Sequence, residues 1–224
     1  MIRTRYLRLV AICVALSVMS GCSSLLPTPA ASPSLFTLDD GSSALVSPAI
    51  LSSLPAAAGS TAKPAPATLI INTPKAAAGY GTAHIVYARR TQEIEYFAFS
   101  LWVDTPAQML TPLIVRAVER TGAFQAVLAA PTAASSRFRL DTEIIRLQQD
   151  FSVAPSRVRL TLRAVLIDGT TKAVVARREF DASVASVSED TYGGVIAAQA
   201  VTQRVLTELA AFCEIGRASC RERV

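Results

Sequence analysis

Residues 157–168 read Arg-Val-Arg-Leu-Thr-Leu-Arg-Ala-Val-Leu-Ile-Asp, and this stretch decides the fold. Polar and apolar side chains alternate from Arg157 to Ala164, which is the pattern of a β-strand with one buried and one solvated face. Asp168-Gly169 predicts a tight turn into a return strand over residues 174–184. The side chains expected to face the core are Val158, Leu160, Leu162, Ala164 and Leu166, followed by Val174, Ala176, Phe180, Ala182 and Val184. Arg157, Arg159, Thr161 and Arg163 are expected to face outward, and Arg178 breaks the pattern.

Further strands are expected upstream of this pair. A long strand over 137–149 changes phase at Ile144-Ile145, which predicts a β-bulge. The apolar stretch Leu69–Asn72 suits a central, buried strand. Residues 83–88 and 93–99 predict a hairpin joined by 89–92, and Gly79 and Gly81 mark a turn. Shorter strands are expected over Leu35–Leu38 and 124–129.

Two helices are expected around these strands. Thr105-Pro106-Ala107-Gln108 predicts the start of the first, with threonine as the cap, proline at the first helical position and glutamine completing a capping box. Pro112 should bend or restart this helix, and Gly122 should end it. Its apolar stripe is Leu110, Leu113, Ile114, Ala117 and Val118. The second helix is expected over 191–213, with Ala198, Val201, Val205, Leu209 and Phe212 buried. The fold class is therefore α/β (α+β), a mixed sheet with flanking helices, one after Thr105 and one C-terminal.

The N-terminus predicts export and a lipid anchor. Residues 1–21 have a basic start and a short apolar stretch, as in a signal peptide, and they end in small residues before Cys22. This junction looks like a lipobox, in which Cys22 is acylated; an ordinary signal peptide with an incidental cysteine is the alternative. Residues 22–34 predict a lipidated, flexible tether. The domain is expected over 35–213, with an Ala/Pro-rich excursion over 39–68 that holds at most a helical turn near Pro48–Leu54.

Composition narrows the classes of function. The chain has 224 residues, about half of them apolar, which allows one domain with a tail and a linker. Removing the three arginines of residues 1–21 lowers the net charge from +5 to +2, and the rest has no basic run, so nucleic-acid binding has little support. Residues 214–224 change abruptly in composition and suggest a non-native tail. Outside residues 1–22 the cysteines are Cys213 and Cys220; a bridge between them is possible, but two late cysteines do not make a disulfide framework.

The residues give little support for catalysis. His84 is the single histidine, and no Gly-x-Ser-x-Gly elbow accompanies it, so we expect a surface or strand histidine and no enzyme. One histidine with scattered carboxylates does not supply a metal site. Gly79-Tyr80-Gly81 lacks the rest of a dinucleotide fingerprint, and we expect no cofactor.

Aromatic residues gather between Tyr80 and Trp102. They can simply fill the core beneath the first helix. Alternatively, Tyr87, Tyr96 and Trp102 line a groove or a partner interface, where aromatic residues are enriched. Asp104 is expected to reinforce the helix start through the helix dipole, with a partner contact as the alternative.

Three stretches together resemble a known family: Ile85-Val86-Tyr87 with Ile94-Glu95-Tyr96-Phe97, Leu101 to Leu110 around Asp104-Thr105-Pro106, and the lipobox with Phe36-Thr37-Leu38. The chain resembles the ABC-type transport auxiliary lipoproteins, which include the paraquat-inducible protein C-like lipoproteins, from about Leu35 to Cys213. The excursion before Leu69 and the C-terminal tail depart from the usual pattern.

The resemblance implies a non-catalytic periplasmic lipoprotein that supports an MCE-type lipid transport system and membrane integrity. The implied partners are an MCE-domain protein and an ABC permease and ATPase, and a homo-oligomeric ring is implied as possible. Because Ser23 rather than aspartate follows Cys22, the resemblance also implies anchoring at the periplasmic face of the outer membrane. A free-standing lipid-binding or small-molecule-binding lipoprotein is the alternative, and an enzyme relying on His84 is the third hypothesis.

Overall fold

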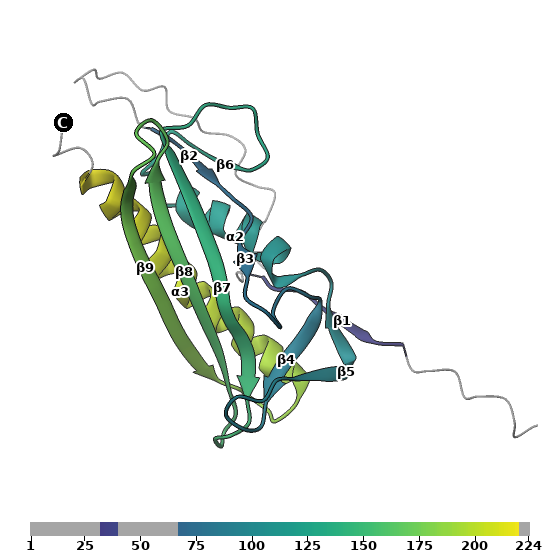
Figure 1. The fold of residues 1–224 in the computed structure, drawn as a ribbon. Coiled ribbons are helices and arrows are strands. Elements are labelled where there is room, and N and C mark those ends of the chain that lie inside the picture. Colours follow the sequence, from purple (N-terminus) through teal and green to yellow (C-terminus); the bar gives the residue numbers. More distant parts are fainter. Residues whose placement is uncertain (1–31, 40–66, 220–224) are drawn as a thin grey trace, which may run out of the picture. The chain divides into compact units, whose positions relative to one another are not determined.

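The computed structural model describes residues 32–39 and 67–219 (Figure 1). The elements below all lie in one compact unit, Pro33–Val224. The predicted signal peptide, Cys22, most of the tether, and the turn predicted at Pro48–Leu54 fall outside the described residues.

The fold is mixed α+β, as predicted. Within the described residues a nine-stranded mixed sheet carries two helices, one mid-chain and one C-terminal. In chain order the elements are β1 (Ser34–Phe36), β2 (Thr68–Ile71), β3 (Lys75–Ala76), β4 (His84–Ala88), β5 (Glu95–Trp102), α2 (Pro106–Glu119), β6 (Ala126–Ala129), β7 (Phe138–Asp150), β8 (Arg157–Asp168), β9 (Val174–Ala185) and α3 (Thr191–Ser219).

Strand β7 organises the sheet, because its two edges are used differently. Along one edge it pairs antiparallel with β8 over its whole length, and β8 pairs with β9. Along the other edge three short strands pair parallel to it in succession: β2 beside Phe138, β3 beside Glu143 and β4 beside Gln149. Strand β2 is central, with β6 on its far side, and β4 continues through β5 to β1. The sheet therefore has one regular wing, β7–β9, and a second wing built from short strands.

The predicted bulge in β7 is confirmed. Ile144 pairs with Leu162 and Arg146 pairs with Thr161, which leaves Ile145 as the extra residue. The extra residue reverses the alternation, so that Ile144 and Leu147 are both buried although they lie three positions apart.

Both helices cover one face of the sheet and enclose the core. Helix α3 contacts β8 and β9, α2 contacts β2 and β6, and the two helices contact each other (Figure 1). The inward residues of β8 and the apolar stripe of α2 are buried, as predicted. The opposite face of β7–β9 carries charged residues in alternation with the core residues.

Helix α2 begins at the predicted cap. The Thr105 hydroxyl oxygen accepts the Gln108 backbone N–H at 3.4 Å, and the Thr105 N–H donates to the Asp104 carboxylate at 2.6 Å. Asp104 thus takes the place expected for the Gln108 side chain. The expected restart at Pro112 is wrong: the helix continues to Glu119 with Pro112 on its exposed side. Gly122 follows with φ +61°, as the predicted stop requires.

The turn between β8 and β9 differs from the prediction. It spans Gly169 to Ala173, and Lys172 rather than Gly169 adopts positive φ (61°). Gly169 is needed for space instead, because a Cβ there would lie 2.7 Å from the Ser136 carbonyl oxygen. The register also shifts next to this turn, between Leu166 and Ile167, so that Val174 is exposed rather than buried.

Two boundaries and one short strand also differ from the prediction. Strand β5 extends to Trp102, and the two-residue strand β3 had no sequence signal. Helix α3 runs to Ser219, past the expected end at Cys213 and into the predicted non-native tail. Cys213 is a buried free thiol, and Cys220 lies outside the described residues.

Candidate functional site

Trp102, at the end of β5, belongs to the core. Its side chain is buried, and together with Val195 and Ala198 of α3 it lines a cavity of about 10 Å³. A cavity of this size holds about one water molecule. The burial of Trp102 therefore favours the interpretation that this residue fills the core.

Tyr87 is also largely buried, in an aromatic cluster at the end of the β4–β5 hairpin. Its ring centroid lies 4.5 Å from that of Phe97 and 5.8 Å from that of Phe151. Its hydroxyl donates to Glu95 at 2.6 Å, and the Arg89 guanidinium lies 5.2 Å above the ring. The hydrogen bond to Glu95, with some burial, raises the pKa of Tyr87. Tyr87 therefore holds the hairpin together.

Tyr96 and Asp104 are the accessible members of the predicted set. Tyr96 is exposed, its ring lies 5.2 Å from that of the exposed His84, and Asp104 caps α2 at the surface. Tyr87 pairs with Glu95, and the neighbouring Tyr96 pairs with Val86, so the two tyrosines point to opposite faces of the hairpin. The four residues do not form one continuous groove, and an interface role for Tyr96 and Asp104 stays a prediction.

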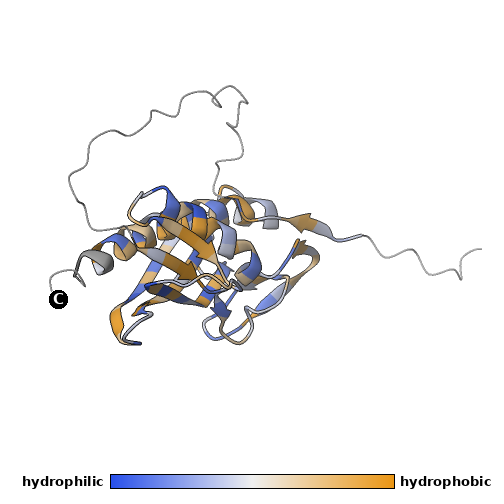
Figure 2. Ribbon diagram, turned by 90° about the horizontal axis from the view of Figure 1, so that it is seen from above, coloured by the Kyte–Doolittle hydropathy of each residue, from blue (hydrophilic) through white to orange (hydrophobic). Residues whose placement is uncertain are grey.

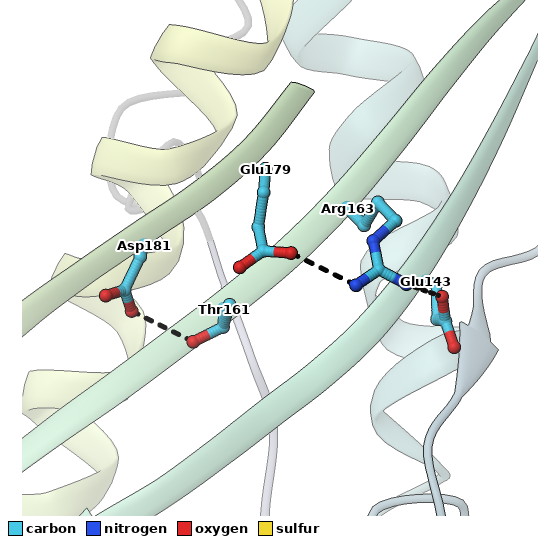
Figure 3. Close-up of polar contacts among 5 residues, drawn as sticks. All are labelled: Glu143, Thr161, Arg163, Glu179 and Asp181. Atoms are coloured by element: carbon cyan, nitrogen blue, oxygen red, sulfur yellow. Dashed lines mark hydrogen bonds and ion pairs between the residues drawn. The ribbon is translucent and has the colours of Figure 1, made fainter. Parts of the chain in front are cut away.

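A second candidate surface is the face of β7–β9 opposite the helices, which we call the polar face. In one cross-strand row, Glu143, Arg163 and Glu179 lie side by side (Figure 3). The Arg163 guanidinium donates to Glu143 at 2.9 Å and to Glu179 at 3.1 Å. An arginine between two carboxylates fixes the register of three strands through planar, charge-assisted hydrogen bonds.

The neighbouring row is built around Asp181. Its carboxylate accepts from the Thr161 hydroxyl at 2.9 Å (Figure 3). The same carboxylate accepts from Arg159 Nε at 2.8 Å. The hydrogen bond from Arg159, supported by that from Thr161, lowers the pKa of Asp181. The same pair raises the pKa of Arg159. The sequence predicted that Arg159, Thr161 and Arg163 face outward, but gave no sign of which carboxylates they meet.

The polar face continues into an open hollow of about 400 Å³ where β2 and β3 meet β7. There the Asn72 amide donates to Asp141 at 2.6 Å, and Arg139 lies 3.3 Å from the same carboxylate oxygen. The lining residues are Asn72, Thr73, Lys75, Arg139, Asp141, Thr142, Glu143, Arg163 and Val165. Sequence analysis missed this hollow because it joins residues about 70 positions apart.

These surfaces differ in the side chains that they expose. Within residues 32–39 and 67–219 no group of three or more His, Cys, Asp and Glu could hold a metal ion. In the same part of the chain, no helix is long and apolar enough to cross a membrane. The polar face offers paired charges, and the second wing offers exposed apolar residues on β1 and β5. Figure 2 colours the ribbon by the hydropathy of each residue.

Two solved structures, the first two below, support the fold. A crystal structure of protein XCC0632 from Xanthomonas campestris superposes with a TM-score of 0.66 at 24% identity, covering 70% of this chain and 89% of that chain. A crystal structure of an uncharacterized protein superposes with a TM-score of 0.58 at 12% identity, covering 82% and 99%. A PelC dodecamer from Paraburkholderia phytofirmans gives a TM-score of 0.41 at 18% identity, covering 67% and 93%.

No curated protein matches the chain in sequence. The family model of the ABC-type transport auxiliary lipoprotein component matches residues 50–211, which is well over half of the 224 residues. The matched range holds β2 to β9, α2 and most of α3. The chain therefore belongs to the ABC-type transport auxiliary lipoprotein component family.

Proposed function

We propose that this protein is a non-catalytic, lipid-anchored accessory subunit of an MCE-type lipid transport system. Its partners are an MCE-domain protein and an ABC permease and ATPase, which supply the energy and the lipid path. Acyl chains on Cys22 hold it at the periplasmic face of the outer membrane, because two or more lipid chains on a cysteine anchor a folded domain stably to a bilayer.

The observation that carries this proposal is the polar face, on a member of a transport-auxiliary family. A sheet of this size normally buries one face and solvates the other. Here the solvated face presents Arg163 between Glu143 and Glu179, and Arg159 beside Asp181. Ordered charges of both signs steer a complementary protein into one orientation and disfavour wrong partners. We propose that the polar face docks the transport partner.

The cavity beneath Trp102 disfavours the alternative of a free-standing lipid-binding protein. Such a protein needs an apolar pocket that encloses most of its ligand. The cavity that Trp102 lines measures about 10 Å³, while the larger hollow between α2 and α3, about 310 Å³, is open and rimmed by Arg120, Gln203 and Glu214. Neither resembles an acyl-chain pocket.

Co-purification tests the proposal. The full-length, tagged protein is captured from detergent-solubilised membranes of cells that carry the native partners, and bound proteins are identified by mass spectrometry. We expect an MCE-domain protein among them. A clean capture without any such partner would count against the proposal.

A charge reversal tests the polar face. Arg163→Glu places a third carboxylate between Glu143 and Glu179, and we expect capture of the partner to fall at least about tenfold, a typical loss for a disrupted interface charge. Arg204→Glu is the matched control, because Arg204 is an exposed arginine on α3, which covers the other face of the sheet. Equal capture by both variants would rule out docking through the polar face.

A further inference from the structure

An exposed apolar strip lies on the β1–β5 wing. Leu35 of β1 pairs in parallel register with Leu101 of β5, and Phe99 and Val103 lie two residues to either side of Leu101. The pairing continues past the strand, because the Val103 N–H donates to the Phe36 carbonyl at 2.8 Å. Alternation places Leu35, Leu101 and Val103 on the side away from the buried Trp102. Phe99 is the exposed residue next to them, within the stretch of β5 where the register against β4 shifts. We call Leu35, Phe99, Leu101 and Val103 the apolar strip.

The strip is unusually accessible for large apolar residues. Leu35 is 63% exposed, Phe99 62% and Val103 55%, while Leu101 between them is half-buried. Residues 96–103 carry no charge, and β1 with its apolar residues is coloured hydrophobic in Figure 2. The polar face of β7–β9 differs sharply, since each of its strands carries charged residues on the solvated side. Contiguous exposed apolar residues on a folded domain mark a surface that is covered in use.

The place of the strip in the chain indicates what covers it. Leu35 is thirteen residues after Cys22, and eleven residues, 23–33, join the proposed anchor to β1. A chain of that length spans at most about 36–40 Å when extended, and about 17–20 Å on average when flexible. The strip therefore belongs to the described elements nearest along the chain to the bilayer, and a short tether keeps it there.

The residues beside the strip also suit a lipid surface. His84 pairs with Leu101, and the ring of His84 lies 5.2 Å from that of Tyr96. Both side chains are exposed and combine an apolar ring with a polar tip. Amphipathic rings next to exposed apolar residues are typical of segments that lie at the headgroup level of a bilayer.

We propose that the apolar strip seats in the headgroup region of the membrane to which Cys22 anchors the chain. This inference rests on the proposed lipid anchor and adds a second, shallow contact. The contact fixes the orientation of the domain, since the strip faces the bilayer and the far end of β7–β9 points away from it. An anchor alone would leave the domain free to rotate on its tether.

Fluorescence quenching tests the orientation. The full-length lipidated protein is reconstituted into vesicles of phosphatidylethanolamine and phosphatidylglycerol, with or without bromine on the acyl chains near the headgroup. Phe99→Trp is compared with Val174→Trp, whose native side chain is equally exposed at 61%. Val174 pairs with Ile167, which pairs with Arg139 near the start of β7. Strand β4 pairs with Gln149, ten residues further along β7, so the two sites are separated by roughly 33 Å along the strand. The wild-type protein, with only the buried Trp102, gives the baseline.

We expect bromine to reduce the added emission of Phe99→Trp at least about twofold, since a side chain at headgroup depth is within reach of the quencher, and to leave that of Val174→Trp unchanged.

Flotation with the vesicles reports the anchor separately. If all proteins float and both tryptophans respond alike, the strip does not face the bilayer, although the anchor stands. A blue-shifted but unquenched Phe99→Trp emission would mean that protein, such as a second copy of the chain, covers the strip, and would also overturn the inference. If the wild-type protein does not float, the proposed lipid anchor is wrong, and so is the proposed contact between the apolar strip and the bilayer.

Discussion

The amide oxygen of Gln149 lies directly against Gly194, so close that a Cβ at position 194 would overlap it. Gln149 is buried at the end of β7, and its amide nitrogen donates to the hydroxyls of Ser156 and Ser186. The first turn of α3 therefore packs on a polar cluster that admits only a glycine. This contact joins the helix to the loops at one end of the sheet.

Gly194→Ala should destabilise the protein although alanine favours helices. The added methyl forces Gln149 out of its hydrogen bonds, and overpacking of this kind costs about 1–3 kcal/mol. Urea unfolding followed by circular dichroism measures the change. Gly81→Ala is the control, because a Cβ there lies 3.8 Å from Ala76, an ordinary contact. An equal effect of both substitutions would contradict the packing argument.

Thr105→Ala should lower the free energy of unfolding by about 1 kcal/mol, because it removes the hydroxyl that accepts the Gln108 N–H at the start of α2. Thr105→Ser keeps an acceptor at the same place. Thermal unfolding of the three proteins should therefore rank serine close to the wild type and alanine below both. A serine variant as unstable as the alanine variant would show that the threonine methyl, and not the cap, matters.

Asp181→Asn should be most costly at neutral pH. The hydrogen bond from Arg159 lowers the pKa of Asp181 in the folded state below its ordinary value of 3.8. A lowered carboxylate pKa contributes stability above the unfolded-state pKa, and this contribution is lost as the pH falls through the folded-state pKa. Because both partners are partly exposed, we expect a difference of at most about 1 kcal/mol at pH 7, and it should disappear as the pH falls through the folded-state pKa, which lies below 3.8. Unfolding titrations from pH 7 to pH 2.5 measure it; a pH-independent difference would be inconsistent with this origin.

The thiol of Cys213 should be unreactive in the folded protein. Burial raises its pKa to about 12, so the thiolate is scarce at neutral pH, and the sulfur is inaccessible to reagents. Alkylation by iodoacetamide at pH 8, quantified on the peptide that contains Cys213, should be slow in buffer and fast in urea. Rapid labelling of the native protein would place Cys213 at the surface instead.

Cys22→Ala should leave the domain folded but release it into the soluble periplasmic fraction, since the proposed acyl chains provide the anchor. Cys220→Ala is the matched control and should stay in the membrane fraction, because Cys220 lies in the predicted tail. Fractionation and immunoblotting measure both. Retention of Cys22→Ala in the membrane would contradict the lipid anchor.

The features that could be predicted from the sequence are the local ones. The alternation of β8, the phase change at Ile145 and the cap at Thr105 each depend on residues within one element, and each is confirmed. Strand β3 has two residues and exists because β7 offers it an edge, so it leaves no periodic signal. The turn before Val174 was also missed, because Asp-Gly suggested a two-residue turn while a shift in strand register selected a longer one.

The surfaces were less predictable than the strands. The predicted interface combined Tyr87, Tyr96 and Trp102 because they are near in sequence. In the structure Tyr87 and Tyr96 lie on opposite faces of the β4–β5 hairpin, and Trp102 is buried in the core. The partners of Arg163 come from β7 and β9, and strand register alone brings them together. Long-range pairing of this kind has no signature within any one stretch of the chain.

The way β7 is shared has a consequence for assembly during synthesis and export. Strands β2, β3 and β4 are synthesised before β7, yet each of them pairs with β7. Leu69, for example, can pair only after Phe138, 69 residues later in the chain, has been made. Strands β7, β8 and β9 with α3 are joined by short turns and can form as a local unit. We therefore expect β7, β8, β9 and α3 to act as the template, and β2, β3 and β4 to join the sheet after them although they are made earlier.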